Sequence, residues 1–251
     1  MATFKFTLDG KEYSAEIEDS ILREAMTQGS LKLVEPVTTA TLRRMESSTI
    51  DFATLHDRAR DGRLEEVLQP FDEMTFHLET GELVTAVCAT VWPNCARFVF
   101  KDCYWMSCMN HDATNAGGYR DSEMRRCILE EIYPTLPKAL RDIMAQVWLH
   151  ETIDGERVSY SDPLFLLDVA DVFGASESIR LRKEPDGFQL PIFERAIDRV
   201  KADVNGVPVW WWLRSVSATS TTLFRAVYTG GSHYHNSAYY SGGVAPSFEI
   251  V

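Results

Sequence analysis

The chain has 251 residues, of which 45% are hydrophobic and 25% are charged, values close to the globular average. This composition excludes a disordered or collagen-like protein, and the length suffices for one large domain or two small ones. The 25 basic and 37 acidic residues leave a net charge of −12. Because so acidic a surface repels phosphate, we do not expect a nucleic acid as partner.

The sequence also bears on membrane insertion and on the state of the cysteines. No apolar run reaches the roughly 18 residues that would cross a membrane, so we expect no membrane insertion. Residues 1–20 show no signal-peptide pattern, which predicts synthesis in the cytoplasm and leaves the final location open. The five cysteines lie in the middle third, and without a leader we expect them to be reduced thiols.

The first seventy residues predict a small α+β module of unknown role. Phe4, Phe6, Tyr13 and Ala15 alternate with polar residues around Asp9-Gly10, which indicates a β-hairpin. A short helix is expected over 21–28 and a second one within 51–69. We therefore predict two domains, residues 1–70 and residues 71–251.

The larger domain begins with strands over 71–103, two of them joined by a hairpin turn at 79–82. Asp121-Ser122 then predicts the start of a helix, and Lys138–Trp148 has a second amphipathic pattern. Leu164–Val172 is expected to form a buried strand that ends in a turn at Gly174. Helical turns over 193–200 and strands over 207–251 complete an α+β class.

Residues 215–248 differ in composition from everything before them. They contain no Lys, Glu, Gln, Met, Trp, Asp, Cys or Ile, and consist largely of Ser, Thr, Ala, Gly, Tyr, His and Asn. Antibody binding loops use the same residue types, because tyrosine gives rigid contact area and small polar residues give adaptable hydrogen bonds. An ordinary surface β-meander rich in these residues is the alternative.

Two rigid clusters flank this segment. Trp210-Trp211-Trp212 precede it, and in a strand they require both faces to be covered. Arg214 beside them predicts a buried salt bridge or a clamp on backbone carbonyls. Gly242–Phe248 follows the segment as a tight turn into a terminal strand.

The order of these motifs carries a resemblance. WWLRS, a Tyr- and Gly-rich stretch and then GVAPSF at the C-terminus, with YRDSEMR and DPLFLL upstream, resemble a family of uncharacterised proteins from gut bacteria, prophages and phages. That family is similar to the variable proteins of diversity-generating retroelements, and the resemblance covers about residues 71–251. It implies a C-type-lectin-like fold whose variable segment, about 216–241, binds a protein or glycan on a cell surface.

In such systems adenine-specific mutagenesis of the gene's 3′ end yields codons that never encode Lys, Glu, Gln, Met or Trp, the types missing here. The resemblance implies ligand-binding roles for Ala218, Thr219, Ser220, Thr222, Leu223, Ala226, Tyr228, Thr229, Ser232, His233, Tyr234, His235, Asn236, Ala238, Tyr239 and Tyr240. It implies scaffold roles for Trp210, Trp211, Trp212, Leu213, Arg214, Phe224, Gly242, Gly243, Val244, Pro246 and Phe248. Homo-oligomers that multiply weak sites are a further expectation.

Other chemistry is weakly encoded. His233-x-His235 is a two-residue metal pair with no third ligand nearby, and Cys103 or Cys108 with His111 is a nucleophile–base pairing of low specificity. Asn110–Asn115 matches a calcium loop only loosely, and no phosphate-binding loop or hydrolase motif occurs. We therefore predict no catalytic residue, no metal and no cofactor.

Two alternatives to a display protein stay open. The formylglycine-generating oxidases share the C-type-lectin-like fold, but their redox cysteines lie late in the domain, and this chain has none after Cys127. The other alternative is an undiversified glycan-binding or virion structural module. The favoured hypothesis is a non-enzymatic ligand-binding protein of the phage or prophage receptor-binding type.

Overall fold

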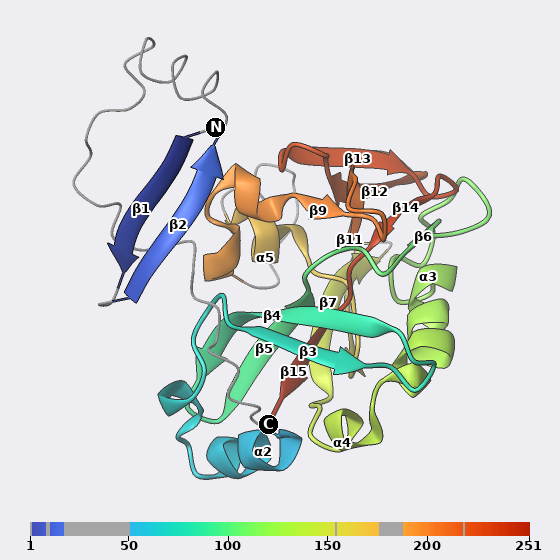
Figure 1. Cartoon of the computed structure of the whole chain (residues 1–251). Coiled ribbons are helices and arrows are strands. Elements are labelled where there is room, and N and C mark those ends of the chain that lie inside the picture. Colours follow the sequence, from blue (N-terminus) through green and yellow to red (C-terminus); the bar gives the residue numbers. More distant parts are fainter. Residues whose placement is uncertain (1, 9–10, 18–50, 154, 176–187, 218) are drawn as a thin grey trace. The chain divides into compact units, whose positions relative to one another are not determined.

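The computed structural model describes residues 2–8, 11–17, 51–153, 155–175, 188–217 and 219–251 (Figure 1). The chain divides into two compact units, Met1–Arg43 and Arg44–Val251. In the first unit, β1 (Ala2–Leu8) and β2 (Lys11–Ile17) pair antiparallel, with Phe6 opposite Tyr13. This confirms the predicted hairpin, whereas the helix expected over 21–28 lies outside the described residues.

The division between the units differs from the boundary predicted near residue 70. Helix α2 (Phe52–Arg60) and the 3-10 turn η1 (Leu64–Glu66) belong to the second unit. Leu55, Ala59 and Leu64 are buried in its core, because the one apolar side of this short segment is turned inward. The polar sequence of 51–69 concealed this contribution.

The first sheet of the second unit has four antiparallel strands in the order β15-β5-β4-β3. Its strands are β3 (Glu73–His77), β4 (Leu83–Trp92), β5 (Cys95–Phe100) and β15 (Ser247–Ile250). The predicted hairpin joins β3 to β4, and Gly81 takes a φ of 97° in its turn, a conformation that favours glycine. The last strand of the chain thus pairs with β5, near the beginning of the domain.

The second sheet has five strands in the order β13-β12-β11-β14-β6. Its strands are β6 (Trp105–Ser107), β11 (Trp211–Val216), β12 (Leu223–Val227), β13 (His233–Ser237) and β14 (Gly242–Val244). The pair β11–β14 is parallel, and the other pairs are antiparallel. Figure 1 shows this sheet above the four-stranded one, and the chain passes from β14 directly into β15 between them.

Two smaller antiparallel pairs complete the strands. They are β7 (Val147–Ile153) with β8 (Glu156–Asp162), and β9 (Lys201–Ala202) with β10 (Pro208–Val209). The 3-10 turns η4 (Pro191–Phe193) and η5 (Ala196–Arg199) confirm the helical turns expected near 193–200. The strands expected over 207–251 are likewise confirmed, and the α+β class holds for the described residues.

The helix predicted after Asp121-Ser122 is confirmed, whereas the prediction of a helix over 138–148 is largely wrong. Ser122 caps α3 (Glu123–Cys127), which continues as a π-turn η2 (Ile128–Ile132) and a 3-10 turn η3 (Tyr133–Thr135). The predicted helix over 138–148 is limited to α4 (Lys138–Arg141), since Met144 bridges Ile250 of β15. Pairing with the sheet edge has prevailed over the amphipathic pattern.

The strand predicted over 164–172 is also wrong. Asp168 caps the helix α5 (Val169–Phe173) in a reciprocal capping box with Asp171, and Gly174 ends the helix at a φ of 89°. Before it, Leu164–Leu167 is fully buried; Phe165 forms a bridge to Ser247 of β15, and the Leu167 carbonyl accepts the N–H of Arg214 of β11. Aspartates at this spacing signal a helix start, and the apolar run around them concealed it.

Candidate ligand-binding surface

Residues 215–248, named the display segment after the hypothesis above, form β12, β13 and β14 with their connecting loops (Figure 1). In the five-stranded sheet β13 and β12 lie at one edge, and β14 lies on the other side of β11. Alternation along the strands divides the side chains between two faces. Phe224 and Ala226 lie on the same face as Trp212, and all three are buried. Val227 lies on the opposite face, again buried. Both faces of β12 therefore belong to the core, and only β13 and the loops offer side chains to solvent.

The tryptophan cluster fixes the sheet from both sides, as the sequence predicted. Trp211 is fully buried, packs on Phe193 and donates its indole N–H to the Arg199 carbonyl at 2.9 Å. Trp212, fully buried on the other face, donates to the Ser107 carbonyl at 2.9 Å. Each ring thus has its polar atom satisfied, which removes the main penalty of burying it.

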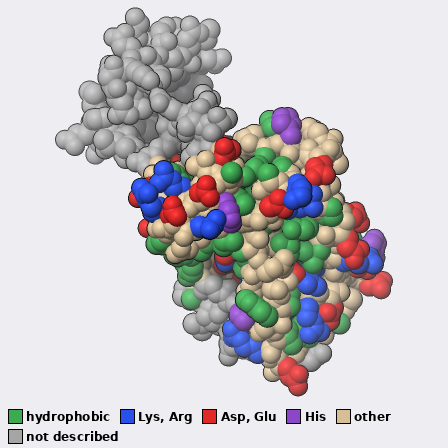
Figure 2. Space-filling view, turned by 90° about the horizontal axis from the view of Figure 1, so that it is seen from below, with side chains coloured by type: hydrophobic (Ala, Val, Ile, Leu, Met, Phe, Trp, Pro, Cys, Tyr) green, Lys and Arg blue, Asp and Glu red, His purple; other side chains and the backbone are tan. Residues whose placement is uncertain are grey.

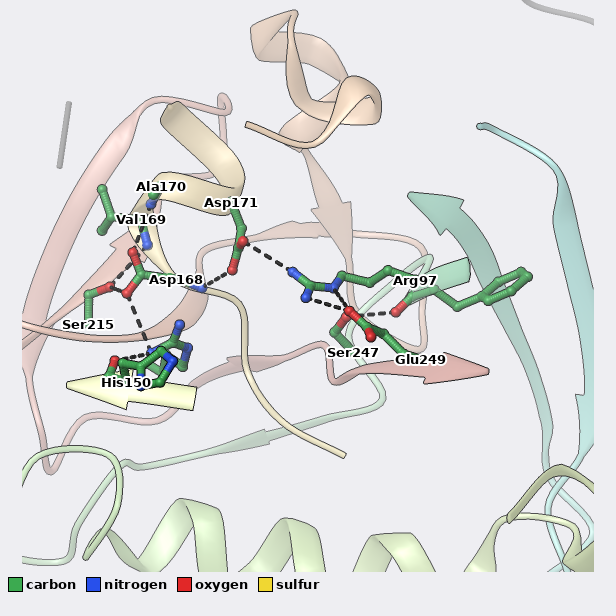
Figure 3. A network of polar contacts seen from close by, with 11 residues as sticks. Arg97, His150, Asp168, Val169, Ala170, Asp171, Ser215, Ser247 and Glu249 are labelled. Atoms are coloured by element: carbon green, nitrogen blue, oxygen red, sulfur yellow. Dashed lines mark hydrogen bonds and ion pairs between the residues drawn. The ribbon is translucent and has the colours of Figure 1, made fainter. Parts of the chain in front are cut away.

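Arg214 makes both contacts that the sequence left open. Its guanidinium donates to the His150 carbonyl at 3.0 Å and lies 3.6 Å from the carboxylate of Asp168. Ser215 donates to the same carboxylate at 2.8 Å and accepts the N–H of Val169 at 3.0 Å (Figure 3). The network connects the C-terminal half of β11 to the capped N-terminus of α5.

A second buried charge group adjoins the first (Figure 3). Arg97 of β5 bonds to Glu249 of β15 at 2.5 Å and to Asp171 of α5 at 3.3 Å. Burial raises the pKa of Asp171 to about 6, and the nearby Arg97 and Arg214 guanidiniums oppose that rise. The group fixes α5 to the four-stranded sheet.

The outward side chains of the segment are aromatic and uncharged. Tyr228, His235, Tyr239 and Tyr240 are exposed, and the last two rings stack at 4.4 Å. Tyr234 is half-buried and lies 5.1 Å from Tyr228 and 6.0 Å from His235, measured between ring centroids. Tyr228, Tyr234 and His235 thus form an aromatic strip along β13 and the turn before it, and the stacked Tyr239 and Tyr240 follow β13.

Trp210 connects the aromatic strip to the core. Trp210 is half-buried and contacts both Trp212, at 4.7 Å, and Tyr234, at 6.1 Å. A Cβ on Gly242 would lie 2.2 Å from the Trp210 ring, so only glycine permits this packing. The exposed strip is therefore continuous with the buried aromatic core.

A loop whose role was not predicted from the sequence, residues 109–115, holds the loop before β12 and the turn after β13 by hydrogen bonds. The side-chain amide of Asn115 donates to the carbonyls of Ser220 and Leu223 at 2.8 and 3.0 Å. The backbone N–H groups of Met109 and Asn110 both donate to the carbonyl of Ala238. In the sequence this loop was recognisable only as polar and Asn-containing. Its bonding partners could not be inferred, because they lie more than a hundred residues away.

The structure divides the predicted ligand-binding residues into three groups. Exposed are Thr219, Tyr228, Ser232, His235, Tyr239 and Tyr240, and half-buried are Ser220, Thr222, Leu223, Thr229, His233, Tyr234 and Asn236. Ala226 and Ala238 are fully buried, so the prediction that they contact a ligand is wrong, and Ala218 lies outside the described residues. The alternation of β12 and the turn after β13 point these two methyl groups inward.

The predicted scaffold residues are buried, apart from the half-buried Trp210. They are Trp211, Trp212, Leu213, Arg214, Phe224, Gly242, Gly243, Val244, Pro246 and Phe248. Gly243 has the same steric role as Gly242, since a Cβ there would lie 2.4 Å from the sulfur of Cys103. Phe248 stacks on Phe98 across β15 and β5 at 5.6 Å.

The histidine pair is divided between two environments. His233 packs edge-on against Phe173 at 5.6 Å, whereas His235 is exposed beside Tyr234. Across the described part of the chain, no group of three or more His, Cys, Asp or Glu side chains has metal-binding geometry. Asn110 uses its amide to hold Thr114 and Glu123, a structural role within its own loop.

The five cysteines are free thiols, as expected. Burial raises the pKa of Cys88 and of Cys103 to about 12 and that of Cys127 to about 11, so these three stay protonated at neutral pH. His111, the base suggested for a cysteine, pairs with Glu123 instead.

The charge of the molecule lies outside the display segment. On the face seen in Figure 2, acidic and basic side chains lie interspersed among hydrophobic and uncharged polar ones. All 37 acidic residues precede residue 215 or follow residue 248, and Arg225 is the one basic residue within the segment. Since Arg225 is buried, the exposed part of the segment is uncharged.

A family model described as "Domain of unknown function (DUF6273)" matches residues 98–251, more than half of the chain. The match begins within β5 and includes the display segment, the tryptophan cluster and most of the buried charge network. Comparisons with curated proteins and with solved structures give no significant match. Among the described residues, no helix is both long and apolar enough to cross a membrane.

Proposed function

The chain belongs to the DUF6273 family, and in the domain that defines the family we propose a non-enzymatic ligand-binding surface on residues 215–248. One observation carries the proposal. Uncharged, exposed tyrosines and a histidine lie on β13 and its loops, in the same sheet as β11, whose tryptophans are buried and hydrogen-bonded. Tyrosine gives large contact area at low conformational cost, and the rigid base means that little order is lost on binding.

The separation of roles within the strands supports the proposal. Tyr239 and Tyr240 touch each other and solvent, while Trp211 and Trp212 form the floor and contact no solvent. Residues of the first kind can change without disturbing the second. This arrangement suits a protein whose contact residues vary while its framework is fixed.

The finer identity follows from the resemblance of the sequence motifs. We propose a C-type-lectin-like domain of the kind found in variable proteins of diversity-generating retroelements, with about 216–241 as the variable segment. The missing Lys, Glu, Gln, Met and Trp in that segment support this. The gene's neighbourhood tests it, since diversification requires a reverse transcriptase gene and an adenine-mutable near-repeat of the segment; their absence contradicts diversification alone.

Binding itself is tested separately. Wild-type protein is screened on a glycan array and on arrayed bacterial surface proteins, with and without EDTA. The Tyr239→Ala/Tyr240→Ala variant should lose the hits, and its melting temperature should stay close to that of wild type because both rings are half exposed. Trp148→Ala is the matched control: this ring is 67% exposed on β7, outside the segment, and its removal should leave binding intact.

Three results contradict the proposal. The double variant retains every hit, or Trp148→Ala loses the hits equally, or the double variant unfolds. Loss of glycan hits in EDTA identifies a calcium lectin, the undiversified alternative, although within 215–248 only Asn236 has a side chain typical of such sites. A screen against esters and thiols tests the alternative of an enzyme on the same fold.

A further inference from the structure

A cavity of about 730 Å³ lies away from the display segment. Its walls come from three places: the β3–β4 hairpin at Glu82–Thr85, the chain leaving β5 at Phe100–Trp105, and the β9–β10 hairpin at Ala202–Gly206. This volume is in the range of small-molecule sites. No residue of 215–248 lines the cavity, so the inference is independent of the proposed function.

The walls are held by the protein's own hydrogen bonds. The N–H of Cys103 donates to the Ala202 carbonyl, and the N–H of Ala202 donates to the carboxylate of Asp102, each at 2.9 Å. The buried ammonium of Lys201 donates to the carbonyls of Phe100 and Lys101 at 2.5 and 2.9 Å. The cavity is therefore preformed, and a ligand has little conformational entropy to remove.

The charges on the lining favour a cation. Glu82, Asp102 and Asp203 line the cavity, and Lys101 is the one basic residue of the lining. Lys101 is already paired with Glu73 at 2.6 Å. Hydrogen bonds from the N–H groups of Asn205 and Val207 lower the pKa of Asp203, so it is ionised at neutral pH.

The remaining lining is aromatic and aliphatic. Tyr104 donates its hydroxyl to Glu82 at 3.0 Å, and its ring contacts Phe100 and Trp105 at 6.2 and 5.5 Å. Leu83 and Val204, from the β3–β4 and β9–β10 hairpins, are 62% and 79% exposed. Carboxylates beside aromatic faces recognise ammonium and guanidinium groups, and the apolar walls suit a hydrocarbon body.

We propose that this cavity binds a small organic cation, a primary ammonium or guanidinium group carried on an apolar body. Glu82 accepts hydrogen bonds from the cation while Tyr104 orients that carboxylate. Leu83 and Val204 cover the apolar part.

Three probes with one carbon skeleton test the charge requirement: 2-phenylethylammonium, 2-phenylethanol and phenylacetate. Binding to the full chain is measured by backbone and indole NMR shifts. The ammonium should bind at least tenfold more tightly than the alcohol, phenylacetate should not bind, and the shifts should be confined to residues around 82–85, 100–105 and 202–206. Equal binding of ammonium and alcohol, or no binding of the ammonium up to tens of millimolar, would overturn the proposal.

Two variants test the assignment of residues. Glu82→Gln keeps an acceptor for Tyr104 but removes one charge, and should weaken the ammonium about tenfold. Glu65→Gln is the matched control, because it changes the net charge equally at an exposed position that does not line the cavity. Val204→Arg places a guanidinium at the exposed wall and should abolish binding. Equal weakening by Glu65→Gln, or undiminished binding to Val204→Arg, would count against the site.

Discussion

The display segment and the charge network behind it handle polarity in opposite ways. Along β13 and its loops the polar side chains are uncharged and face solvent. Around α5 the side chains of Asp168, Asp171 and Arg214 carry charges and are buried with partners, and Arg97 beside them is half-buried. Charge is excluded from the surface that we propose binds a ligand and concentrated where it orients the framework.

The difference shows how one sheet can tolerate substitutions on its surface while its framework stays rigid. An exposed tyrosine has few neighbours, so its replacement changes little besides the surface. A buried ion has neighbours on all sides, and removing one member leaves another charge without compensation. The contrast predicts that substitutions destabilise the protein strongly in the network and weakly on the exposed surface, and the predictions follow in order of expected effect.

The largest effect is expected for Trp211→Ala. The change removes a fully buried ring together with its hydrogen bond to the Arg199 carbonyl, so the free energy of unfolding should fall by about 3–5 kcal/mol. Urea denaturation measures it, with Trp148→Ala as the exposed control, expected to change by less than about 0.5 kcal/mol. Similar costs for the two variants would remove the distinction between framework and surface.

The next effect concerns the ion pair. Arg214→Met keeps most of the side-chain volume but leaves the carboxylate of Asp168 without its guanidinium, and should cost about 3 kcal/mol. Adding Asp168→Asn to Arg214→Met should recover part of the loss, since the amide still caps α5 without burying a charge. If the two changes cost the sum of their separate effects, the pair contributes nothing as a pair.

These framework residues also show what the sequence can and cannot predict. The tryptophans and Arg214 lie within one run of five residues and the closing glycines are adjacent to each other, so their roles could be inferred from local alternation and size. Strands over 71–103 and 207–251 were predictable for the same reason. The display loops were recognisable by composition, and Tyr239 and Tyr240 are indeed exposed.

What could not be predicted depends on partners distant in the chain. Asn115 reaches Ser220, and Arg97 joins Asp171 to Glu249, contacts that no local pattern encodes. Val147–Ile153 became a strand because β8 offered pairing, and the preceding Met144 bridges Ile250 of β15. Predicting that Ala226 points inward would have required the register of β12 against β11, because an alanine by itself does not indicate which face it lies on.

A pH titration separates the network from the surface. The pKa of Asp171 in the folded protein is about 6, above its usual 3.8, so between these values the folded state binds the proton more strongly than the unfolded state. Its contribution to stability is therefore fully present below about pH 4 and is lost as the pH rises through 6.

Asp171→Asn removes this dependence. The difference in unfolding free energy, wild type minus variant, should fall by about 2–3 kcal/mol from pH 4 to pH 7. Urea denaturation at a series of pH values measures it, with Asp142→Asn, an exposed ion-pair residue, as a control that should change far less over the range. A difference that is constant, or that rises with pH, contradicts the buried environment of Asp171.

The smallest expected effect is on the proposed binding surface itself. The net charge of −12 belongs to the framework, and the exposed part of 215–248 carries none of it. Contacts made by tyrosine rings and small polar groups do not release counterions, and charges beyond about 10 Å are screened at moderate salt. A ligand captured on the arrays should therefore bind with a Kd that changes less than about threefold between 50 and 500 mM NaCl. A steeper weakening would show that framework carboxylates reach the ligand, and that the uncharged strip is not the whole of the contact.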